Sequence, residues 1–589
     1  MKLIISLLLL ATTAFAAKPN VLFIAVDDMR PELGCYGNKI IKTPNIDRLA
    51  ARGLVFNHAY VQQAVCSPSR TALLTGLRPD KTRVWDLVTH FRVAQPDCVT
   101  LPQHFKQNGY HCAGMGKIFH IGLEDGRSWS VPHWYPKGKS VDTDPIDWTK
   151  KINTPHNVDK EEYANAVSPE DNDKRAEKGK EGKEGKEGKS GPAFEVSPKS
   201  DDDLPDGATA AEAVKRLHEL KGKTEPFFLA VGFLKPHLPF VSPKKYWDMY
   251  DPATIPVPAF DHLPSGSPEF AGHNNSELHN YIGVPKENPI PVDFSRTLRH
   301  GYYAAITYTD TQIGKVLDAL EKEGLADNTV IVLWGDHGWQ LGEHGLWEKH
   351  TNFEIAARAP LIISVPKQKT AGQKCDAQVE FVDVYPTLAD ICGLPAPVKI
   401  DGSSLKPFIE NPAAPATKIA MSQYPRSAGK DGQVMGYSVR NERYRCTFWR
   451  ERYGSKIVAT ELFDELNDPD ETVSLADKPE HKELITSLAK NLPPVMEKTA
   501  AAPAPGKKKK SKKAKPETTT KTADAEERGP KFDKLDKEKA GKITREYYTT
   551  HQSDADAAGK RFDLWDSNKD GFLSREEYVT QGGRHPEAK

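Results

Sequence analysis

The sequence has few cysteines, and no long apolar run follows its N-terminal segment. Seven cysteines among 589 residues are too few for a disulfide scaffold, and their odd number leaves at least one cysteine for another task. A membrane-spanning helix needs roughly 18 or more apolar residues. The longest later apolar runs, NVLFIAV and TVIVLW, have only the length of strands. The sequence therefore predicts neither a disulfide-rich scaffold nor a membrane span.

The chain also lacks an excess of charge of either sign. Its 81 Lys and Arg residues balance 81 Asp and Glu residues, so no overall electric field favours nucleic acid as a partner. With 38% hydrophobic residues, the chain can bury a large core, and its length allows about four domains of ~150 residues.

The first residues have the pattern of an export signal. Lys2 forms a short basic region, an apolar run extends from Leu3 to Leu10, and Ala14-Phe15-Ala16 forms an A-x-A cleavage site. We expect residues 1–16 to be removed as a signal peptide. The mature protein would then act in a periplasmic, extracellular or lumenal compartment.

Between residues 17 and 497, β-branched runs alternate with helix-like segments, which predicts an α/β fold with a mostly parallel sheet flanked by helices. We expect PNVLFIAVDDMR to be a buried strand, IDRLAARGLVF a helix and Cys66 to Gly76 a second helix. From about residue 400, GYSVRNERYRCTFW and TELFDELNDP predict the antiparallel sheet of a smaller C-terminal α+β subdomain.

Two stretches lack the apolar residues that a packed core needs. Residues 174–191, KRAEKGKEGKEGKEGKSG, form a low-complexity insertion that we expect to be disordered. Residues 498–530 are rich in Lys, Ala and Pro and predict a linker. The basic cluster of this linker suits either contact with polyanions or a solvated spacer.

Residues 531–589 predict a helical pair of EF-hands. The run FDLWDSNKDGFLSREEYV has oxygen-bearing residues at the ligand spacing of an EF-hand loop, with Gly571 at the sharp turn. The expected ligands of one Ca²⁺ are Asp566, Asn568, Asp570, Phe572 through its backbone carbonyl, and Glu577. The upstream hand is expected to be degenerate, because Ala540 and Tyr547 occupy two of its ligand positions.

Two predicted strands end in charged residues. Asp27 and Asp28 follow the first strand, and Asp336 and His337 follow TVIVLWG. The carboxyl ends of strands line the ligand crevice of an open α/β sheet, and adjacent carboxylates repel unless a cation lies between them. These residues therefore favour a hard divalent cation, Ca²⁺ or Mg²⁺, over zinc. Taken alone, Asp27 and Asp28 also suit a helix N-cap followed by a surface Asp.

Cys66 stands at the start of the predicted helix in VCSPSRTALLTGLRP. Pro68 suits the first turn of a helix, and the free amide groups and the macrodipole at that end favour an anion. Cys66 is therefore a candidate for half of a disulfide, for a metal thiolate or for the precursor of a more reactive group. We expect this position to stabilise a thiolate.

The run Cys66-Ser-Pro-Ser-Arg70 resembles the Cys-x-Pro-Ser-Arg signature of type I sulfatases. The resemblance extends from Pro19 to about Leu475 and points to the iduronate-2-sulfatase-like branch. It rests on the segments RPDKTRVWD, GYHCAGMGKIFH, FFLAVGFLKPHLPF, GDHGWQLGEHGLWEKHTNFE, SQYPR and MGYSVR. It implies an alkaline-phosphatase-like fold and the hydrolysis of sulfate esters in a sulfated carbohydrate, for example a 2-O-sulfated uronate.

The resemblance also implies a cofactor and a set of site residues. In that family a separate maturation enzyme oxidises the cysteine to formylglycine. The implied Ca²⁺ ligands are the formylglycine made from Cys66 together with Asp27, Asp28, Asp336 and His337. Arg70 would brace the formylglycine, and the remaining implied catalytic residues, which would bind sulfate or transfer protons, are Lys117, His120, His237 and Lys349.

Two other functions are compatible with the sequence. The first is hydrolysis of phosphonate or phosphate esters, because some members of the same superfamily use the same modified cysteine. The segments GKIFH and SQYPR argue against it. The second is a non-catalytic calcium-binding surface protein in which the EF-hands matter and the core is inert. The complete set of implied catalytic residues argues against this alternative.

Overall fold

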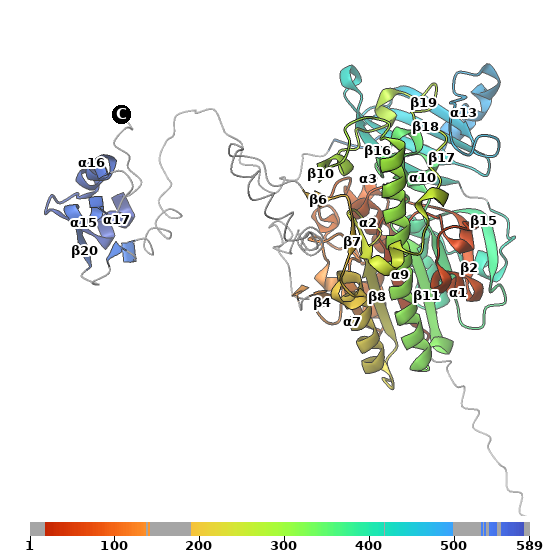
Figure 1. The fold of residues 1–589 in the computed structure, drawn as a ribbon, viewed down its shortest axis with the longest axis horizontal. Helices are drawn as coiled ribbons and strands as arrows, with labels where there is room; N and C mark the ends of the chain where they lie inside the picture. Colours follow the sequence, from red (N-terminus) through yellow and green to blue (C-terminus); the bar gives the residue numbers. More distant parts are fainter. Residues whose placement is uncertain are drawn as a thin grey trace, which may run out of the picture. The chain divides into compact units, whose positions relative to one another are not determined.

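The computed structural model describes residues 18–136, 139–141, 190–416, 419–498, 532–533, 535–536, 541–550 and 555–581. The chain forms two compact units, Met1–Pro505 and Gly506–Lys589 (Figure 1). The predicted signal peptide lies outside the described residues, as do residues 174–189 of the insertion and residues 499–530 of the linker.

A nine-stranded sheet forms the centre of the first unit. All of its strands are parallel to one another except β14 and β5, which run in the opposite direction. The predicted mostly parallel sheet is therefore confirmed. The strands lie in the order β15 (Gln373–Glu380), β2 (Leu54–Tyr60), β14 (Leu361–Ser364), β11 (Thr329–Gly335), β1 (Asn20–Val26), β8 (Phe227–Phe233), β3 (His111–Gly116), β4 (His133–Tyr135) and β5 (Lys139–Val141).

The central strand β1 shows why this sheet needs a layer on both faces. Every residue of β1 is buried, and alternate side chains point to opposite sides of a strand. Leu22 and Ile24 belong to the apolar core on one face, whereas Val21 and Phe23 belong to the core on the other. A strand of this kind is stable only with helices on both sides.

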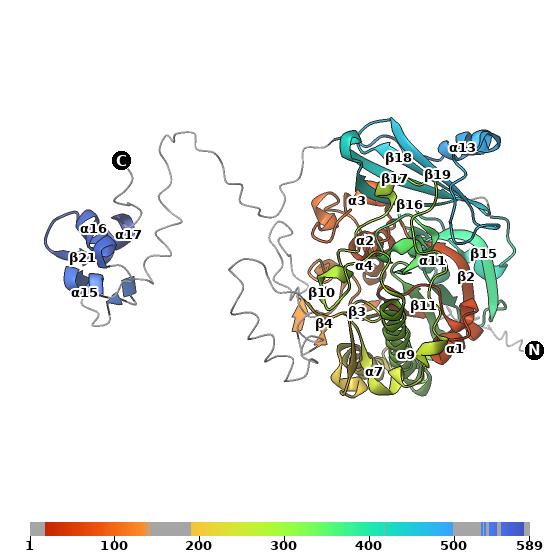
Figure 2. The same ribbon diagram turned by 45° about the horizontal axis from the view of Figure 1, so that its top comes forward.

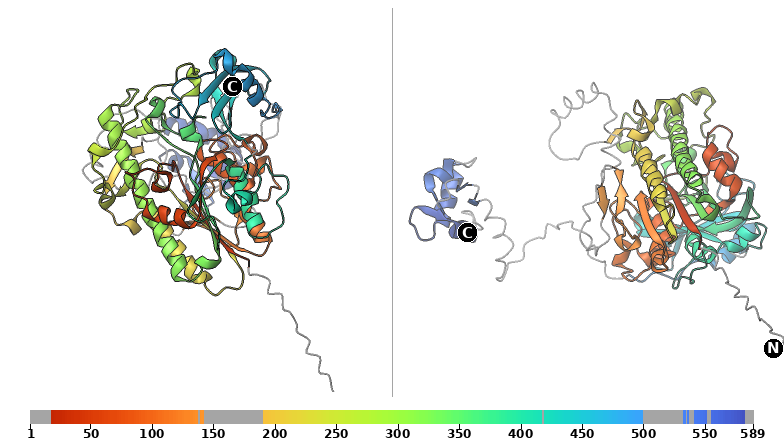
Figure 3. Two further views of the ribbon diagram at one scale, coloured as in Figure 1. Left: turned by 90° about the vertical axis from the view of Figure 1, so that its right-hand side faces the viewer. Right: turned by 90° about the horizontal axis from the view of Figure 1, so that it is seen from below.

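Helices supply these two layers (Figure 2). One face packs against α1 (Pro44–Arg52), α7 (Pro205–Leu220) and the long α9 (Val292–Lys322). The other face packs against α2 (Cys66–Thr75), α4 (Leu101–Gln107) and α11 (Val384–Ile391). Helices α7 and α9 lie side by side (Figure 3).

One predicted helix is too long. The segment IDRLAARGLVF was expected to be helical throughout, but α1 ends at Arg52 and Gly53 is extended, with φ −118° and ψ −171°. Leu54 then begins the buried strand β2. The glycine and the β-preferring residues after it end the helix, because they gain more from pairing with β14 and β15 than from another helical turn.

The predicted C-terminal subdomain is present, with an antiparallel sheet. Its strands pair in the order of the chain: β16 (Ala420–Ser427), β17 (Gln433–Arg440), β18 (Tyr444–Glu451) and β19 (Ile457–Asp464). Helix α13 (Lys482–Ala489) packs on β18. The short elements of the first unit are α3 (Pro79–Thr82), β6 (Ser190–Pro192), β7 (Phe194–Ser197), β9 (Phe240–Pro243), α8 (Lys244–Trp247), β10 (Tyr281–Ile282), β12 (Gln340–Leu341), β13 (Trp347–Glu348), α10 (Glu354–Ala357) and α12 (Lys406–Glu410).

The second unit has a small apolar core of its own, which includes Phe562, Trp565 and Leu573. Two short strands pair antiparallel and connect the helices around this core. The described elements are β20 (Lys542–Thr544), α15 (Arg545–Thr550), α16 (Ala555–Trp565), β21 (Phe572–Ser574) and α17 (Arg575–Gln581).

The seven cysteines all lie in the described part of the chain, and none of them forms a disulfide. Among the described helices, none combines the length and apolar character that crossing a bilayer requires.

Gly232 on β8 has no side chain, which allows the backbone of Lys117 to lie directly against it. A Cβ atom at Gly232 would lie 2.2 Å from the backbone oxygen and 2.4 Å from the carbonyl carbon of Lys117. Because backbone atoms cannot move aside without distorting the sheet, we expect Gly232→Ala to lower the free energy of unfolding by about 3 kcal/mol. Urea denaturation followed by circular dichroism measures this change.

Gly454→Ala is the matched control. Its Cβ atom would meet the carboxylate end of Glu451, 2.2 Å from Oε2, and this side chain can rotate away. We expect a loss of less than about 0.5 kcal/mol. Equal losses in the two variants would contradict the constraint inferred at Gly232.

A candidate active site at the carboxyl ends of the strands

The predicted site residues follow five strands of the sheet. Because the carboxyl ends of parallel strands meet at one edge, the segments after β1, β11, β8, β3 and β2 come together. Asp27 and Asp28 follow β1, and Asp336 and His337 follow β11. His237 follows β8, Lys117 and His120 follow β3, and Cys66 follows β2. Lys349 follows the short strand β13.

Cys66 is the first residue of α2, as predicted, and is 2% exposed. Its Sγ lies 3.4 Å from Nε2 of His337 and 3.9 Å from Oδ1 of Asp28. Burial, reinforced by the charge of Asp27, raises the pKa of the Cys66 thiol well above its usual value, and the two nearby lysines only partly oppose this. Burial in the folded chain thus works against the thiolate that was expected at this helix N-terminus.

Arg70 ties the strand ends to α2. Its Nη2 lies 3.0 Å from Oδ1 of Asp27, and its Nε lies 2.8 Å from Oδ2 of Asp336. The Nη1 group donates to the backbone oxygens of Lys117 and Ile118. All three charged side chains are completely buried, so the guanidinium satisfies two carboxylates that water cannot reach.

Asp27 and Asp28 have different electrostatic environments. Burial acts to raise the pKa of Asp27, but the charges of Lys117 and Arg70 hold it well below the usual value. The pKa of Asp28 is raised well above the usual value by burial, against the effect of Lys349 and with the repulsion of Asp27. Asp28 is thus the carboxylate that needs an additional positive partner.

The donor atoms around Cys66 fit a hard divalent cation. Ligand atoms of Asp27, Asp28, Cys66 and His237 lie within 4.8 Å of one another, and so do those of Cys66, Asp336 and His337. Buried carboxylate oxygens are the donors that Ca²⁺ and Mg²⁺ prefer.

The ring of His337 supports this fit. Its Nδ1 lies 2.9 Å from the backbone oxygen of Gly338, so this nitrogen carries the proton. Burial lowers the pKa of His337, which leaves Nε2 as a lone pair at 3.2 Å from Oδ1 of Asp28. A lone pair and a carboxylate oxygen at this distance repel each other unless a cation or a proton lies between them.

Lys349 and His237 lie on the other side of Asp28. The Lys349 Nζ is 3.3 Å from Oδ2 of Asp28 and 2.8 Å from Oε2 of Glu277. Although burial acts to lower it, these two carboxylates raise the pKa of Lys349 well above its usual value, so the amine is charged. His237 donates from Nδ1 to the backbone oxygen of Leu238 (2.7 Å), and its Nε2 faces Oδ2 of Asp28 at 3.7 Å.

Lys117 and His120 complete the set. Lys117 binds Asp27 through an ion pair. His120 is partly exposed, and its Nδ1 has no hydrogen-bond partner among the described residues. Burial, together with the positive charge of Lys117, lowers the pKa of His120 well below its usual value, so the ring is neutral and able to accept a proton.

Glu277 is a site residue that sequence reasoning missed. Besides binding Lys349, its Oε1 lies 3.4 Å from Nε2 of His237, and its Oε2 lies 3.6 Å from Nε2 of His350. Glu277, Glu348 and His350 could together hold a metal ion, but the ammonium group of Lys349 already neutralises Glu277. The residue stands in an irregular segment without periodic pattern, so no local signal identifies it.

The predicted ligands of the second EF-hand form a loop between α16 and α17. Oδ2 of Asp566 accepts from the backbone nitrogen of Gly571 (3.0 Å), and Oε1 of Glu577 accepts from that of Asn568 (3.3 Å). Asp570 accepts from the backbone nitrogen of Phe572. Gly571 has φ +83°, as the sharp turn requires. These side-chain oxygens thus accept hydrogen bonds from the backbone of the loop itself.

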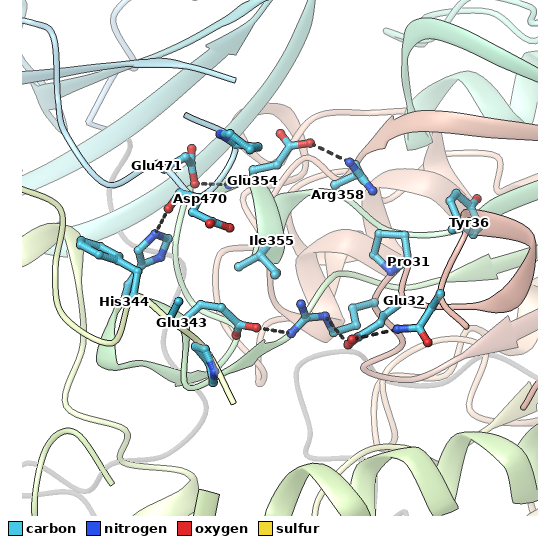
Figure 4. A pocket seen from close by; sticks show the side chains of 16 residues that line it. Pro31, Glu32, Tyr36, Glu343, His344, Glu354, Ile355, Arg358, Asp470 and Glu471 are labelled. Atoms are coloured by element: carbon cyan, nitrogen blue, oxygen red, sulfur yellow. Dashed lines mark hydrogen bonds and ion pairs between the residues drawn. The ribbon is translucent and has the colours of Figure 1, made fainter. Parts of the chain in front are cut away.

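A separate cavity of 420 Å³ lies between the segment after β1 and the C-terminal subdomain (Figure 4). Its charged side chains pair with one another: Arg30 with Glu343 at 3.0 Å, and Arg358 with Glu354 at 3.4 Å. None of the predicted site residues lines it. The candidate site is therefore the cluster around Cys66 rather than this cavity.

Comparisons with known proteins identify the family of the chain. The sulfatase family model matches residues 19–394, and the model for the N-sulphoglucosamine sulphohydrolase C-terminal region matches residues 342–498. The iduronate 2-sulfatase of Mus musculus is 34% identical over 543 residues, covering 80% of this chain and 93% of that protein. That of Homo sapiens is 35% identical over 499 residues, covering 73% and 84%.

Solved structures share the fold at lower identity. The phosphonate monoester hydrolase of Agrobacterium radiobacter has a TM-score of 0.60 at 22% identity, covering 80% of this chain and 94% of that chain. A structure solved with its substrate D-glucosamine-2-N,6-O-disulfate has a TM-score of 0.60 at 23% identity, covering 80% and 96%. The expected alkaline-phosphatase-like fold, with its antiparallel C-terminal subdomain, is confirmed.

Fold and site together define a hydrolase of sulfuric esters. The chain belongs to the sulfatase family, because the model of that family matches most of the first unit. Iduronate 2-sulfatases are among its relatives.

Arg70→Met tests the tie between the strand ends. Removing the guanidinium leaves Asp27 and Asp336 buried without this partner, so we expect a loss of about 3–5 kcal/mol in the free energy of unfolding. Arg296→Met removes a partly exposed pair with Asp293, and we expect it to cost less than about 1 kcal/mol. Urea denaturation at neutral pH compares the two. A loss for Arg70→Met no larger than for the control would mean that Arg70 does not hold the strand ends.

Proposed function

We propose that this protein is an exported sulfatase in which Cys66 is converted to formylglycine and acts as the nucleophile on a sulfated carbohydrate. The observation that carries the proposal is the position of Cys66, buried at the start of α2 and in contact with both Asp28 and His337. A neutral, desolvated thiol is a poor nucleophile, whereas a hydrated aldehyde at this position presents hydroxyl groups to the same carboxylates.

Asp27, Asp28, Asp336 and His337 would hold Ca²⁺ in this site, together with the residue made from Cys66. The ion would supply Lewis acidity for the nucleophile and for a sulfate oxygen. The donor set of carboxylates supports a hard ion, and Nε2 of His337, which faces Cys66 and Asp28, would be its nitrogen ligand.

The remaining side chains suit the charges that develop during sulfate transfer. Lys117 and Lys349 are positioned to balance negative charge on the sulfuryl oxygens. The Nδ1 of His237 donates to the backbone oxygen of Leu238, so His237 can give a proton from Nε2 to the leaving oxygen only after the ring has taken up a second proton. His120 can accept the proton whose removal lets sulfate leave as the aldehyde re-forms, so that the nucleophile is regenerated without hydrolysis of a stable ester.

The substrate class is proposed from the relatives. Iduronate 2-sulfatases are similar to this chain over most of their length, which supports a sulfated uronate or a similar sugar in a polysaccharide. Hydrolysis of phosphonate or phosphate esters remains the alternative, because a phosphonate monoester hydrolase shares the fold.

The mass of the tryptic peptide that contains Cys66, from protein purified out of its native host, tests the nucleophile. Conversion to formylglycine lowers the mass by about 18 Da relative to the thiol. We expect this loss, together with hydrolysis of an aryl sulfate but not of an aryl phosphate, and we expect Cys66→Ala to abolish the activity. Unmodified Cys66, or faster hydrolysis of the phosphate, would contradict the proposal.

The second unit is proposed to bind one further Ca²⁺. Asp566, Asn568, Asp570, Phe572 and Glu577 would be its ligands, and the loop geometry around Gly571 supports this. The pairing of β20 with β21 is how two EF-hand loops support each other, so the first hand would act as a structural partner.

Glu577→Gln in the full chain tests this calcium site. Glu577 is expected to bind the ion through both carboxylate oxygens, so we expect bound calcium to fall from about two ions to about one per chain, measured by calorimetric titration. Glu546→Gln changes an exposed residue on α15 and serves as control. We expect the sulfatase activity of both variants to stay unchanged. An unaltered stoichiometry in Glu577→Gln would overturn the assignment.

A further inference from the structure

Arg426, near the end of β16, carries a positive charge that no carboxylate balances in the described part of the chain. Its Nε donates to the backbone oxygen of Phe270 (2.9 Å), and its Nη2 donates to that of His350. The guanidinium stacks on the ring of Tyr424 at 4.3 Å. Within the part of the chain that the structure describes, the groups that act on its pKa include no carboxylate.

The fully buried arginines of the first unit differ from the half-buried Arg426 in this respect. Arg70 pairs with two aspartates, Arg92 lies 2.6 Å from Asp125, and Arg445 pairs with Glu354. Burying a charge without a partner is costly. Burial accordingly lowers the pKa of Arg426, whereas the carboxylate partners of Arg70 raise the pKa of that residue despite its burial.

The unpaired guanidinium lies next to the candidate site. The backbone oxygen that it contacts belongs to His350, the residue after Lys349. The side chain of His350 is held by the hydroxyl of Tyr424, 2.6 Å from Nδ1, and its backbone nitrogen donates to Ala64, just before Cys66. Arg426 is therefore separated from the proposed sulfate-binding lysine by a single residue.

The Nη1 group of the guanidinium is its least tightly held nitrogen. It lies 3.4 Å from the backbone oxygen of the adjacent Pro425, whereas the other two nitrogens fix the orientation on Phe270 and His350, and the group also hydrogen-bonds to the side chain of Tyr424. A guanidinium held in this way presents a planar donor group that matches a carboxylate or a sulfate.

We propose that Arg426 binds a second anionic group of the substrate, a carboxylate or a second sulfate on the sugar that carries the scissile ester. This inference rests on the proposed function and narrows its substrate class: the preferred substrates are sulfated sugars with an additional negative charge, and neutral monosulfated sugars are poor substrates. Arg426 then acts in selecting the substrate and has no part in cleaving the ester.

Matched substrates and an Arg426→Gln variant test this role. The substrates are a 4-methylumbelliferyl uronide 2-O-sulfate, its uncharged methyl ester, a disulfated neutral hexoside with its monosulfated counterpart, and 4-nitrophenyl sulfate. We expect Arg426→Gln to lower kcat/KM on the anionic sugar about 100-fold, because a hydrogen bond between charged groups is lost. For the methyl ester and the aryl sulfate we expect kcat/KM to change less than about 3-fold.

The pattern across substrates identifies the anionic group. A loss confined to the uronide identifies a carboxylate, and a loss confined to the disulfated hexoside identifies a second sulfate. Arg426→Lys is expected to recover part of the loss, because it keeps the charge without the planar fork. Arg443→Gln is the control, since Arg443 also stacks on a tyrosine, Tyr444, but pairs with Asp464. We expect it to leave all substrates unaffected.

Two outcomes would overturn the proposal: equal losses on anionic and neutral sugars, or a wild-type enzyme that does not discriminate between them. The affinity of the sulfated uronide for the Cys66→Ala protein, measured by calorimetry, tests Arg426 without depending on the proposed chemistry. If the wild-type protein hydrolyses no sulfate ester, the proposed function fails, but calorimetry of the sulfated uronide still reports on Arg426. An affinity that Arg426→Gln leaves unchanged would overturn the inference by itself.

Discussion

The guanidinium of Arg70 is the interaction on which the site depends. It joins the end of β1 through Asp27, the end of β11 through Asp336 and the end of β3 through the backbone of Lys117. Its own helix begins with Cys66. Because the group is completely buried, its bonds are neither screened by salt nor exchanged with water. The position of Cys66 relative to three strands therefore follows from one side chain.

Around this tie, the charges on the two sides of Asp28 have opposite signs. On one side, carboxylates and the lone pair of His337 create a negative environment that suits a cation. On the other, Lys349 provides fixed positive charge that suits an oxyanion, and Lys117 provides a second such charge beside Asp27. His337 and His237 each have Nδ1 tied to a backbone oxygen, so both rings direct Nε2 toward the reaction centre. Such preorganisation is costly to stability and useful mainly in catalysis.

The sequence predicted those parts of the site that stand beside a strong local pattern. Asp27 and Asp336 end buried apolar strands, and a sheet of parallel strands brings such ends together. The direction of the pKa shift of Cys66 was not predictable, because it depends mainly on how deeply the fold buries the thiol. Glu277 reaches the site from an irregular segment. Only tertiary packing places it there, so no spacing in the chain reveals it.

The loop that carries Lys349 has a backbone conformation that its residues do not favour by themselves, and the fold stabilises it. Its neighbours Glu348 and His350 both have positive φ, +104° and +72°, which costs about 1–3 kcal/mol each for such residues. Tertiary bonds offset this cost: Glu348 accepts from the backbone of Leu278, and His350 donates to Ala64. The second bond attaches the loop to the segment before Cys66. The strained backbone therefore serves to keep the lysine and the cysteine in a fixed relation, which a relaxed loop would not provide.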